Sequence, residues 1–75
     1  MLPYDGHTVA LRPDFTTEVM PRHGWATLTD AARACGLSHT TLLRIQRGEV
    51  APGARAIAAL MAGTGEDFEA LFVVT

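Results

Sequence analysis

The three residues Gly36-Leu37-Ser38 constrain the fold of this chain more than any other feature of its sequence. Gly36 tolerates the left-handed backbone conformation that ends a helix. Ser38 can cap a following helix, because its hydroxyl oxygen accepts a hydrogen bond from a backbone N–H of the first turn. These residues therefore predict a tight turn between two short helices.

The segment before this turn has the pattern of an amphipathic helix that begins after Thr27. Thr27 and Asp30 have the spacing of an acidic capping box, in which each side chain bonds the backbone N–H of the other residue. The apolar residues that follow recur at helical spacing and form one stripe of Leu28, Ala31, Ala32 and Cys35. We expect this stripe to face the core, and Cys35 to be a packed thiol rather than a reactive one.

The segment after the turn predicts a helix from His39 to Arg47 with two different faces. At 100° per residue, Leu42 and Ile45 fall on one side and can anchor the helix in a core. The other side carries polar and basic groups and one exposed leucine, from His39, Thr40, Leu43, Arg44 and Arg47. The two helices and their turn thus predict a helix-turn-helix unit.

Weaker patterns predict the elements that precede this unit. Apolar residues alternate over residues 8–11, which indicates a short strand. Pro13 suits the first turn of a helix, and Phe15 and Val19 would share one face of that helix. We expect Pro21 to end the helix or to kink its last turn.

The remaining elements follow from apolar spacing and glycine positions. A helix is expected over Gly53–Ala62, and the run Gly63-Thr64-Gly65 is expected to break it. A last helix is expected over Glu66–Phe72, followed by a strand at residues 73–74 that pairs with residues 8–11. The expected fold class is therefore all-α, with five short helices around the helix-turn-helix, to which short strands at the two ends can add a pairing.

The net charge of −2 at first argues against a nucleic-acid partner, but the charges are unevenly placed. Residues 22–55 hold five arginines against two acidic residues, whereas the two ends together hold one arginine against six acidic residues. A basic middle between acidic ends suits a protein that binds DNA with one face. Chance placement of six arginines explains the asymmetry equally well, so the charges alone decide nothing.

Residues 27–38 and 41–48, followed by Pro52 and by Phe68-Glu-Ala-Leu-Phe72, resemble in order and spacing the phage repressor and Cro family. These are the lambda-repressor-like helix-turn-helix proteins, and the resemblance covers residues 27–72. It implies five short helices and transcriptional repression. It also implies binding as a homodimer to the major groove of double-stranded DNA at a two-fold operator.

The helix face described above, together with this resemblance, predicts which residues read bases. They are His39, Thr40, Leu43 and Arg44. An arginine can bond the O6 and N7 atoms of guanine at the same time, and an apolar side chain can touch a thymine methyl group. Two alternatives stay open, since Arg44 can simply be solvated and His39, at the start of the helix, can meet a phosphate.

Phosphate contacts are expected from hydroxyl and guanidinium groups around the same helix, namely Thr27, Ser38, Arg33, Arg47 and Arg55. Such contacts position a protein on DNA without reading its sequence. Arg47 has an alternative partner in the nearby Glu49. Arg33 and Arg55 can equally be solvated.

The domain expectation is simple for a chain of 75 residues. Residues 1–12 form an arm or strand, residues 13–72 form the helix-turn-helix DNA-binding domain, and residues 73–75 form a tail or strand. Residues 1–12 show no signal peptide, and no apolar run approaches the roughly 20 residues that cross a bilayer, so a cytoplasmic protein without a membrane partner is expected.

Catalytic, metal and cofactor sites are not expected. One cysteine cannot form an internal disulfide, and His7, His23 and His39 lack the spacing of metal ligands. Ser38 and His39 are the nearest approach to a nucleophile and a base, but consecutive helical positions do not face each other. An enzyme is therefore not predicted.

The resulting hypothesis is a phage- or prophage-type transcription regulator, a repressor that occupies operator DNA as a homodimer. The main alternative is a protein-interaction module on the same fold, such as an antitoxin or an antirepressor, which would suit the acidic ends and an exposed Leu43. A recombination directionality factor is a third alternative. An interaction module would co-purify with its partner and would show no salt-dependent retention on DNA.

Overall fold

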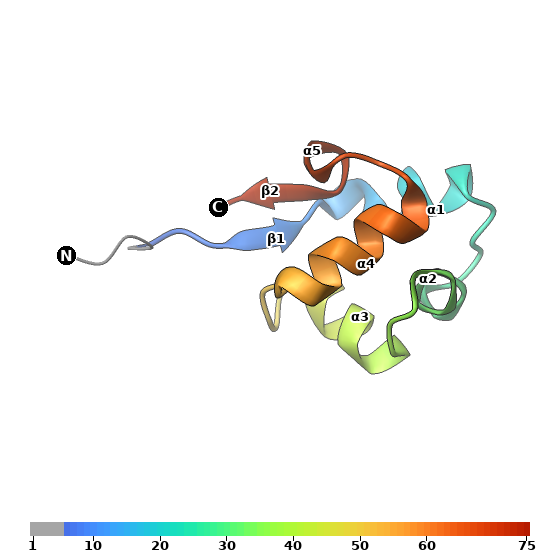
Figure 1. Cartoon of the computed structure of the whole chain (residues 1–75), viewed down its shortest axis with the longest axis horizontal. Coiled ribbons are helices and arrows are strands. Elements are labelled where there is room, and N and C mark those ends of the chain that lie inside the picture. Colours follow the sequence, from blue (N-terminus) through green and yellow to red (C-terminus); the bar gives the residue numbers. More distant parts are fainter. Residues whose placement is uncertain (1–5) are drawn as a thin grey trace.

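The computed structural model describes residues 6–75, which form a mostly helical body and a small two-stranded antiparallel sheet (Figure 1). The elements follow in the order β1 (Val9–Leu11), the 3-10 helix η1 (Pro13–Phe15), α1 (Val19–Arg22), α2 (Leu28–Cys35), α3 (His39–Gln46), α4 (Ala54–Thr64), α5 (Phe68–Leu71) and β2 (Phe72–Val74). The coarse expectation of short helices with paired strands at the two ends is confirmed. The expected arm falls in part on residues 1–5, outside the described residues.

The turn between α2 and α3 has the local geometry that the sequence predicts. Thr27 and Asp30 form the reciprocal capping box, with both N···O distances at 3.2 Å. Gly36 ends α2 at a φ of 74°, in the left-handed region. The Ser38 hydroxyl accepts a hydrogen bond from the Thr41 N–H at 3.1 Å and so caps α3. Helix α3 ends one residue earlier than expected, because Arg47 is its C-cap.

The single helix expected from Pro13 is wrong, since the chain forms η1 and the one-turn α1 instead. Pro21 gives the physical reason, because it has no N–H to bond the carbonyl of Thr17 and continue a helical ladder. Within α1, Pro21 is the third residue, where a backbone N–H would have no helical partner anyway. Phe15 and Val19 nevertheless both lie in the core, as expected.

Helix α4 is longer than expected, and the prediction that Gly63 breaks it is wrong. The helix runs through Gly63 and ends at Gly65, whose φ is 70°. A Cβ atom at position 63 would lie 2.5 Å from Cys35 Sγ and 2.9 Å from Cys35 Cα. The glycine therefore permits a close approach of α4 to α2 rather than marking the end of α4.

The last helix, unlike α4, is shorter than expected. Only residues 68–71 form α5, and Phe72 is already the first residue of β2. The expected pairing of the two ends is confirmed, with Leu11 opposite Phe72 and Val9 opposite Val74. Pairing draws Phe72 out of the helix because its side chain then packs in the core, where it is almost fully buried.

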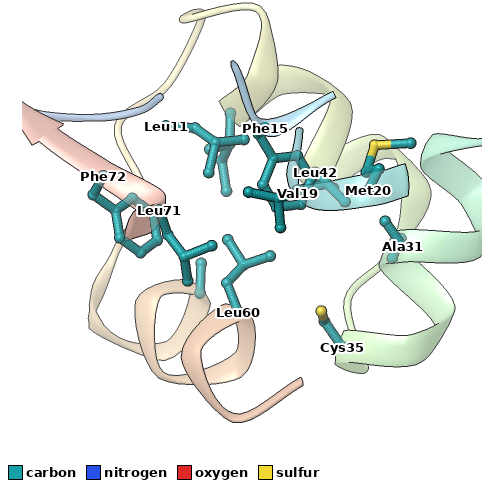
Figure 2. Close-up of a cluster of buried hydrophobic side chains, with 13 residues drawn as sticks. Leu11, Phe15, Val19, Met20, Ala31, Cys35, Leu42, Leu60, Leu71 and Phe72 are labelled. Atoms are coloured by element: carbon teal, nitrogen blue, oxygen red, sulfur yellow. The ribbon is translucent and has the colours of Figure 1, made fainter. Parts of the chain in front are cut away.

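The core takes side chains from β1, from every helix and from β2 (Figure 2). The largest fully buried side chains are Phe15, Leu42, Leu60, Leu71 and Val19. Leu28, which the sequence assigns to the buried stripe of α2, is only half-buried at the edge of this core. None of the helices in the described part of the chain is both long enough and apolar enough to span a membrane.

We predict that Gly63→Ala lowers the free energy of unfolding by up to about 2 kcal/mol, since the usual overpacking cost of about 1–3 kcal/mol is partly offset. The added methyl group would collide with the backbone and side chain of Cys35. Helix propensity acts in the opposite direction and favours alanine by about 1 kcal/mol. Urea unfolding followed by circular dichroism measures the net effect.

Ala62→Ser provides a matched control, because Ala62 is exposed in the same turn of α4. Its effect should stay within about 0.5 kcal/mol, as is usual for surface substitutions. A Gly63→Ala variant more stable than the unsubstituted protein by the full propensity gain of about 1 kcal/mol would contradict the close contact between α2 and α4.

Candidate nucleic-acid interface

Helix α3 has one side in the core and the other in solvent, as its sequence predicts. Leu42 is fully buried and Ile45 is 3% exposed. Thr40 and Arg44 are exposed on the opposite side. An eight-residue helix is marginal by itself in water, so the two buried residues both stabilise α3 and fix its rotation against the body.

The remaining expected base-reading residues divide into two groups. His39 is exposed at the first position of α3. Leu43 is half-buried, so the expectation of a fully exposed leucine is wrong. The exposed face of α3 is therefore more polar than the sequence suggests.

The two hydroxyl residues expected at phosphates both cap their own helices. Thr27 accepts the Asp30 N–H, and within the described residues its hydroxyl makes no bond as a donor. The Ser38 hydroxyl accepts the Thr41 N–H and donates to Thr41 Oγ1 at 2.7 Å. Both residues are exposed. The Thr27 hydroxyl proton therefore has no acceptor among the described residues. The Ser38 hydroxyl, in contrast, must break its hydrogen bond to Thr41 Oγ1 before it can donate to another group.

The arginines near α3 differ in their partners. Arg47 Nη1 lies 3.6 Å from Glu49 Oε2, and both side chains are more than half exposed. This is the alternative partner that the sequence offers for Arg47, and such an exposed pair contributes little to stability. Arg33, Arg44 and Arg55 are exposed and have no acidic partner within the part of the chain that the structure describes.

A cluster around Glu66 changes the charge distribution and was not predicted from the sequence. Arg22 Nη2 donates to both carboxylate oxygens of Glu66, at 2.7 and 2.8 Å. His23 Nε2 lies 3.0 Å from Glu66 Oε2, and the His23 ring stacks on Trp25 with centroids 4.7 Å apart. The Arg22–Glu66 pair joins residues 44 positions apart, and no local sequence pattern indicates a contact at that separation.

This cluster removes Arg22 from the basic middle of the sequence. Its charge is matched by Glu66, so the unmatched positive charge lies around α2, α3 and the start of α4. The Arg22 hydrogen bonds, and then the His23 contact, lower the pKa of Glu66 below its ordinary value. The same hydrogen bonds raise the pKa of Arg22, so both groups keep their charges in neutral solution.

The next features are the groups that could hold a metal ion and the thiol of Cys35. Among residues 6–75, no group of three His, Cys, Asp or Glu side chains is arranged to hold a metal ion. Cys35 is buried, and this burial raises the pKa of its thiol, which keeps it protonated. On α3, hydrogen-bond donors lie on the exposed side of a helix whose other side is buried.

Comparison of the chain with protein-family models, with characterised proteins and with solved structures gives no match. The interpretation of α3 therefore depends on the geometry and chemistry of its own residues.

The Glu66 cluster predicts an acid dependence of stability. Because the folded pKa of Glu66 lies below its unfolded value, the ionised carboxylate stabilises the fold above the unfolded pKa. This contribution is lost as the pH falls through the lower, folded pKa. We expect Glu66→Gln to lower the melting temperature at pH 7 and to reduce the difference in melting temperature between pH 7 and pH 3.

Glu69→Gln is the matched control, because Glu69 is an exposed acid that has no ion pair in the described part of the chain. It should leave the pH dependence nearly unchanged. Equal pH profiles for the Glu66→Gln variant and the unsubstituted protein would rule out a stabilising role for the cluster.

Proposed function

We propose that this chain is a sequence-specific DNA-binding transcription regulator, in which α2 and α3 form a helix-turn-helix and α3 enters the major groove. One observation carries the proposal. Helix α3 follows α2 after a three-residue turn, buries Leu42 and Ile45, and exposes Thr40 and Arg44 on its outer side. The major groove accepts an α-helix, and its floor presents hydrogen-bonding groups that differ for each base pair.

Arg44 is the main candidate for base reading. Arg44 is exposed in the last turn of α3 and has no acidic partner within the described residues. It can therefore bond guanine O6 and N7 without first breaking an ion pair. His39 and Thr40 would meet neighbouring bases or the adjoining phosphate, and the exposed part of Leu43 would contact a thymine methyl group.

Phosphate contacts would come from residues at the edges of this face. Arg33 lies on α2, Arg55 lies in the first turn of α4, and Arg47 follows α3. The Thr27 and Ser38 hydroxyls lie at helix starts, where backbone N–H groups also favour an anion. These contacts would set the register of α3 in the groove while the outer face of α3 reads the bases.

The biological role proposed here is that of a phage or prophage repressor of the Cro type. Such a regulator acts by occupying operator DNA, so that the promoter is blocked. Binding as a homodimer is part of the proposal, because one chain of this size offers little surface for tight binding to DNA. Two copies on one face of B-DNA would contact half-sites about 34–36 Å apart.

We predict that Arg44→Ala relaxes sequence preference at one base pair in each half-site. The loss of a bidentate arginine–guanine contact costs about 1–3 kcal/mol of discrimination, which corresponds to about 5- to 150-fold in relative affinity. Selection of bound sequences from random DNA, followed by competition binding, measures this change. An unaltered preference would remove Arg44 from the reading face.

Arg12→Ala is the control of the same residue type, because Arg12 lies after β1, outside α2 and α3, and pairs with Asp14. It removes the same charge but should leave the base preference unchanged. A similar loss of preference in both variants would indicate a general effect of charge rather than base reading.

We further predict that Arg47→Ala reduces the magnitude of the salt slope of DNA binding by about 0.9, the value for one lost phosphate contact. Its base preference should remain, since phosphate contacts carry no sequence information. Glu49→Gln is the companion variant, because it frees Arg47 from its only acidic partner among the described residues. An unchanged slope for Arg47→Ala would show that Arg47 does not contact phosphate.

A protein-interaction module, such as an antitoxin or antirepressor, is the second candidate function. The observation that favours it is the exposure of three large apolar residues outside α3, namely Val50, Val73 and Val74. Retention on DNA that weakens with salt would support the regulator. Absence of such retention, together with a stoichiometric protein partner, would support the interaction module.

A further inference from the structure

His39 differs from the arginines around α3, because the charge of a histidine changes near neutral pH. It is the first residue of α3, and it is exposed. Arginine stays protonated in proteins, whereas histidine gains or loses a proton between about pH 5 and 8. Among the residues of α3, only His39 and Arg44 are ionisable, so His39 alone can vary its charge in this range.

The buried side of α3 shows in which direction the His39 side chain leaves the helix. Leu42 and Ile45 mark the direction of the core. At 100° per residue, Thr40 lies almost opposite these two residues, and His39 lies about 90° from the outward direction. His39 thus belongs to one flank of α3, beside the exposed face that carries Thr40 and Arg44.

A helix in the major groove brings its flanks close to the sugar-phosphate backbone. A helix with its side chains is about 10–12 Å wide and the major groove is about 12 Å wide, so little room is left on either side. Under the proposed function, Thr40 and Arg44 face the floor of the groove, and His39 faces one of its walls. A phosphate oxygen accepts a hydrogen bond from an imidazole N–H, and this bond is stronger when the ring is protonated.

Within the described residues, no carboxylate competes with a phosphate for the His39 ring. Helix α3 packs mainly against α2 and β1. Strand β1 has no ionisable side chain, and those of α2 are Asp30, Arg33 and the buried Cys35. Asp30 is the only carboxylate among them, and it bonds the Thr27 N–H at the start of α2. His39 forms no ion pair in the described part of the chain.

The other charges of α3 lie at its opposite end. Arg44 is in the last turn, and Arg47 is the C-cap and pairs with Glu49. The residues on either side of His39 are a serine and two threonines, which carry no charge. A proton on His39 therefore has no fixed anionic partner among the described residues, and a DNA phosphate would be its first.

We propose that His39 binds a DNA phosphate as an imidazolium, so that each chain takes up a proton from solution when it binds DNA. This inference rests on the proposed function, which places α3 in the major groove. A complex that holds more protons than its free components is favoured as the pH falls, so the affinity for DNA rises in that direction. The change lies in the range of about pH 5 to 8, where histidine titrates.

Calorimetry measures the proton uptake directly. The probe is a double-stranded oligonucleotide obtained by selection of bound sequences from random DNA. Titrations near pH 7 in buffers of different ionisation enthalpy give the number of protons that move on binding, and we expect a net uptake by the unsubstituted chain. His39→Gln keeps a hydrogen-bonding group that never carries charge, so it should remove this uptake.

His7→Gln and His23→Gln are the matched controls, because they replace the other two histidines of the chain. His7 lies before β1, and His23 contacts Glu66, so both lie outside α2 and α3. Both variants should retain the proton uptake. Equal uptake by His39→Gln and the unsubstituted chain, or no uptake by the unsubstituted chain, would overturn the proposal.

The pH and salt dependence of the affinity gives a second readout. Between pH 8 and pH 6, binding by the unsubstituted chain should tighten by about 1.5- to 5-fold per chain, the factor for one exposed ion pair. The magnitude of its salt slope should increase by up to about 0.9 per chain. His39→Lys carries a charge throughout this range, so its affinity and slope should change little with pH. A pH dependence that persists in full in His39→Lys would overturn the proposal.

DNA binding itself separates this inference from the proposed function. Sequence-selective binding that is independent of pH would refute the proton uptake by His39 and leave the regulator intact. Absence of binding to selected or random DNA at every pH from 6 to 8 would refute the regulator, and the His39 contact with it.

Discussion

The close contact between Gly63 and Cys35 is the constraint on which the arrangement of the helices depends. It lets α4 approach α2 to a distance that no other residue at position 63 would permit. Small residues on the facing side of α2, among them Ala31 and Ala32, are buried in the same region. Because α2 is held by α4 and the turn to α3 is only three residues long, this contact also limits where α3 can lie.

The residues buried on the inner face of α3 determine which residues are exposed on its outer face. Leu42 and Ile45 occupy the core and fix the rotation of the helix, so the exposure of Thr40 and Arg44 is set by residues that never meet a ligand. A second attachment, through the Arg22 and Glu66 side chains, ties α1 to the segment after α4. Under the proposed function, these anchors present α3 to DNA in a fixed orientation, which lowers the entropic cost of binding.

The sequence predicted local features well and close tertiary contacts poorly. The capping box at Thr27 and the cap at Ser38 depend on neighbouring residues, and both are confirmed. Gly63 looked like a helix breaker, because only the packed structure shows the sulfur atom opposite it. The partner of Arg22 lies 44 residues away, so this contact could not be read from spacing. The predicted roles of the α3 residues in base reading stay predictions.

The charge pattern shows why net charge is a poor guide to a nucleic-acid partner for this chain. The molecule carries −2 overall, but its charges are unevenly placed, and the Arg22–Glu66 pair contributes nothing to the net charge. Charges more than a Debye length from a phosphate, about 8–10 Å at physiological salt, are largely screened from it. Under the proposed function, the acidic residues near the chain ends would therefore oppose binding only weakly. The unmatched guanidiniums of Arg33, Arg44 and Arg55 would act at short range, where the interaction is strongest.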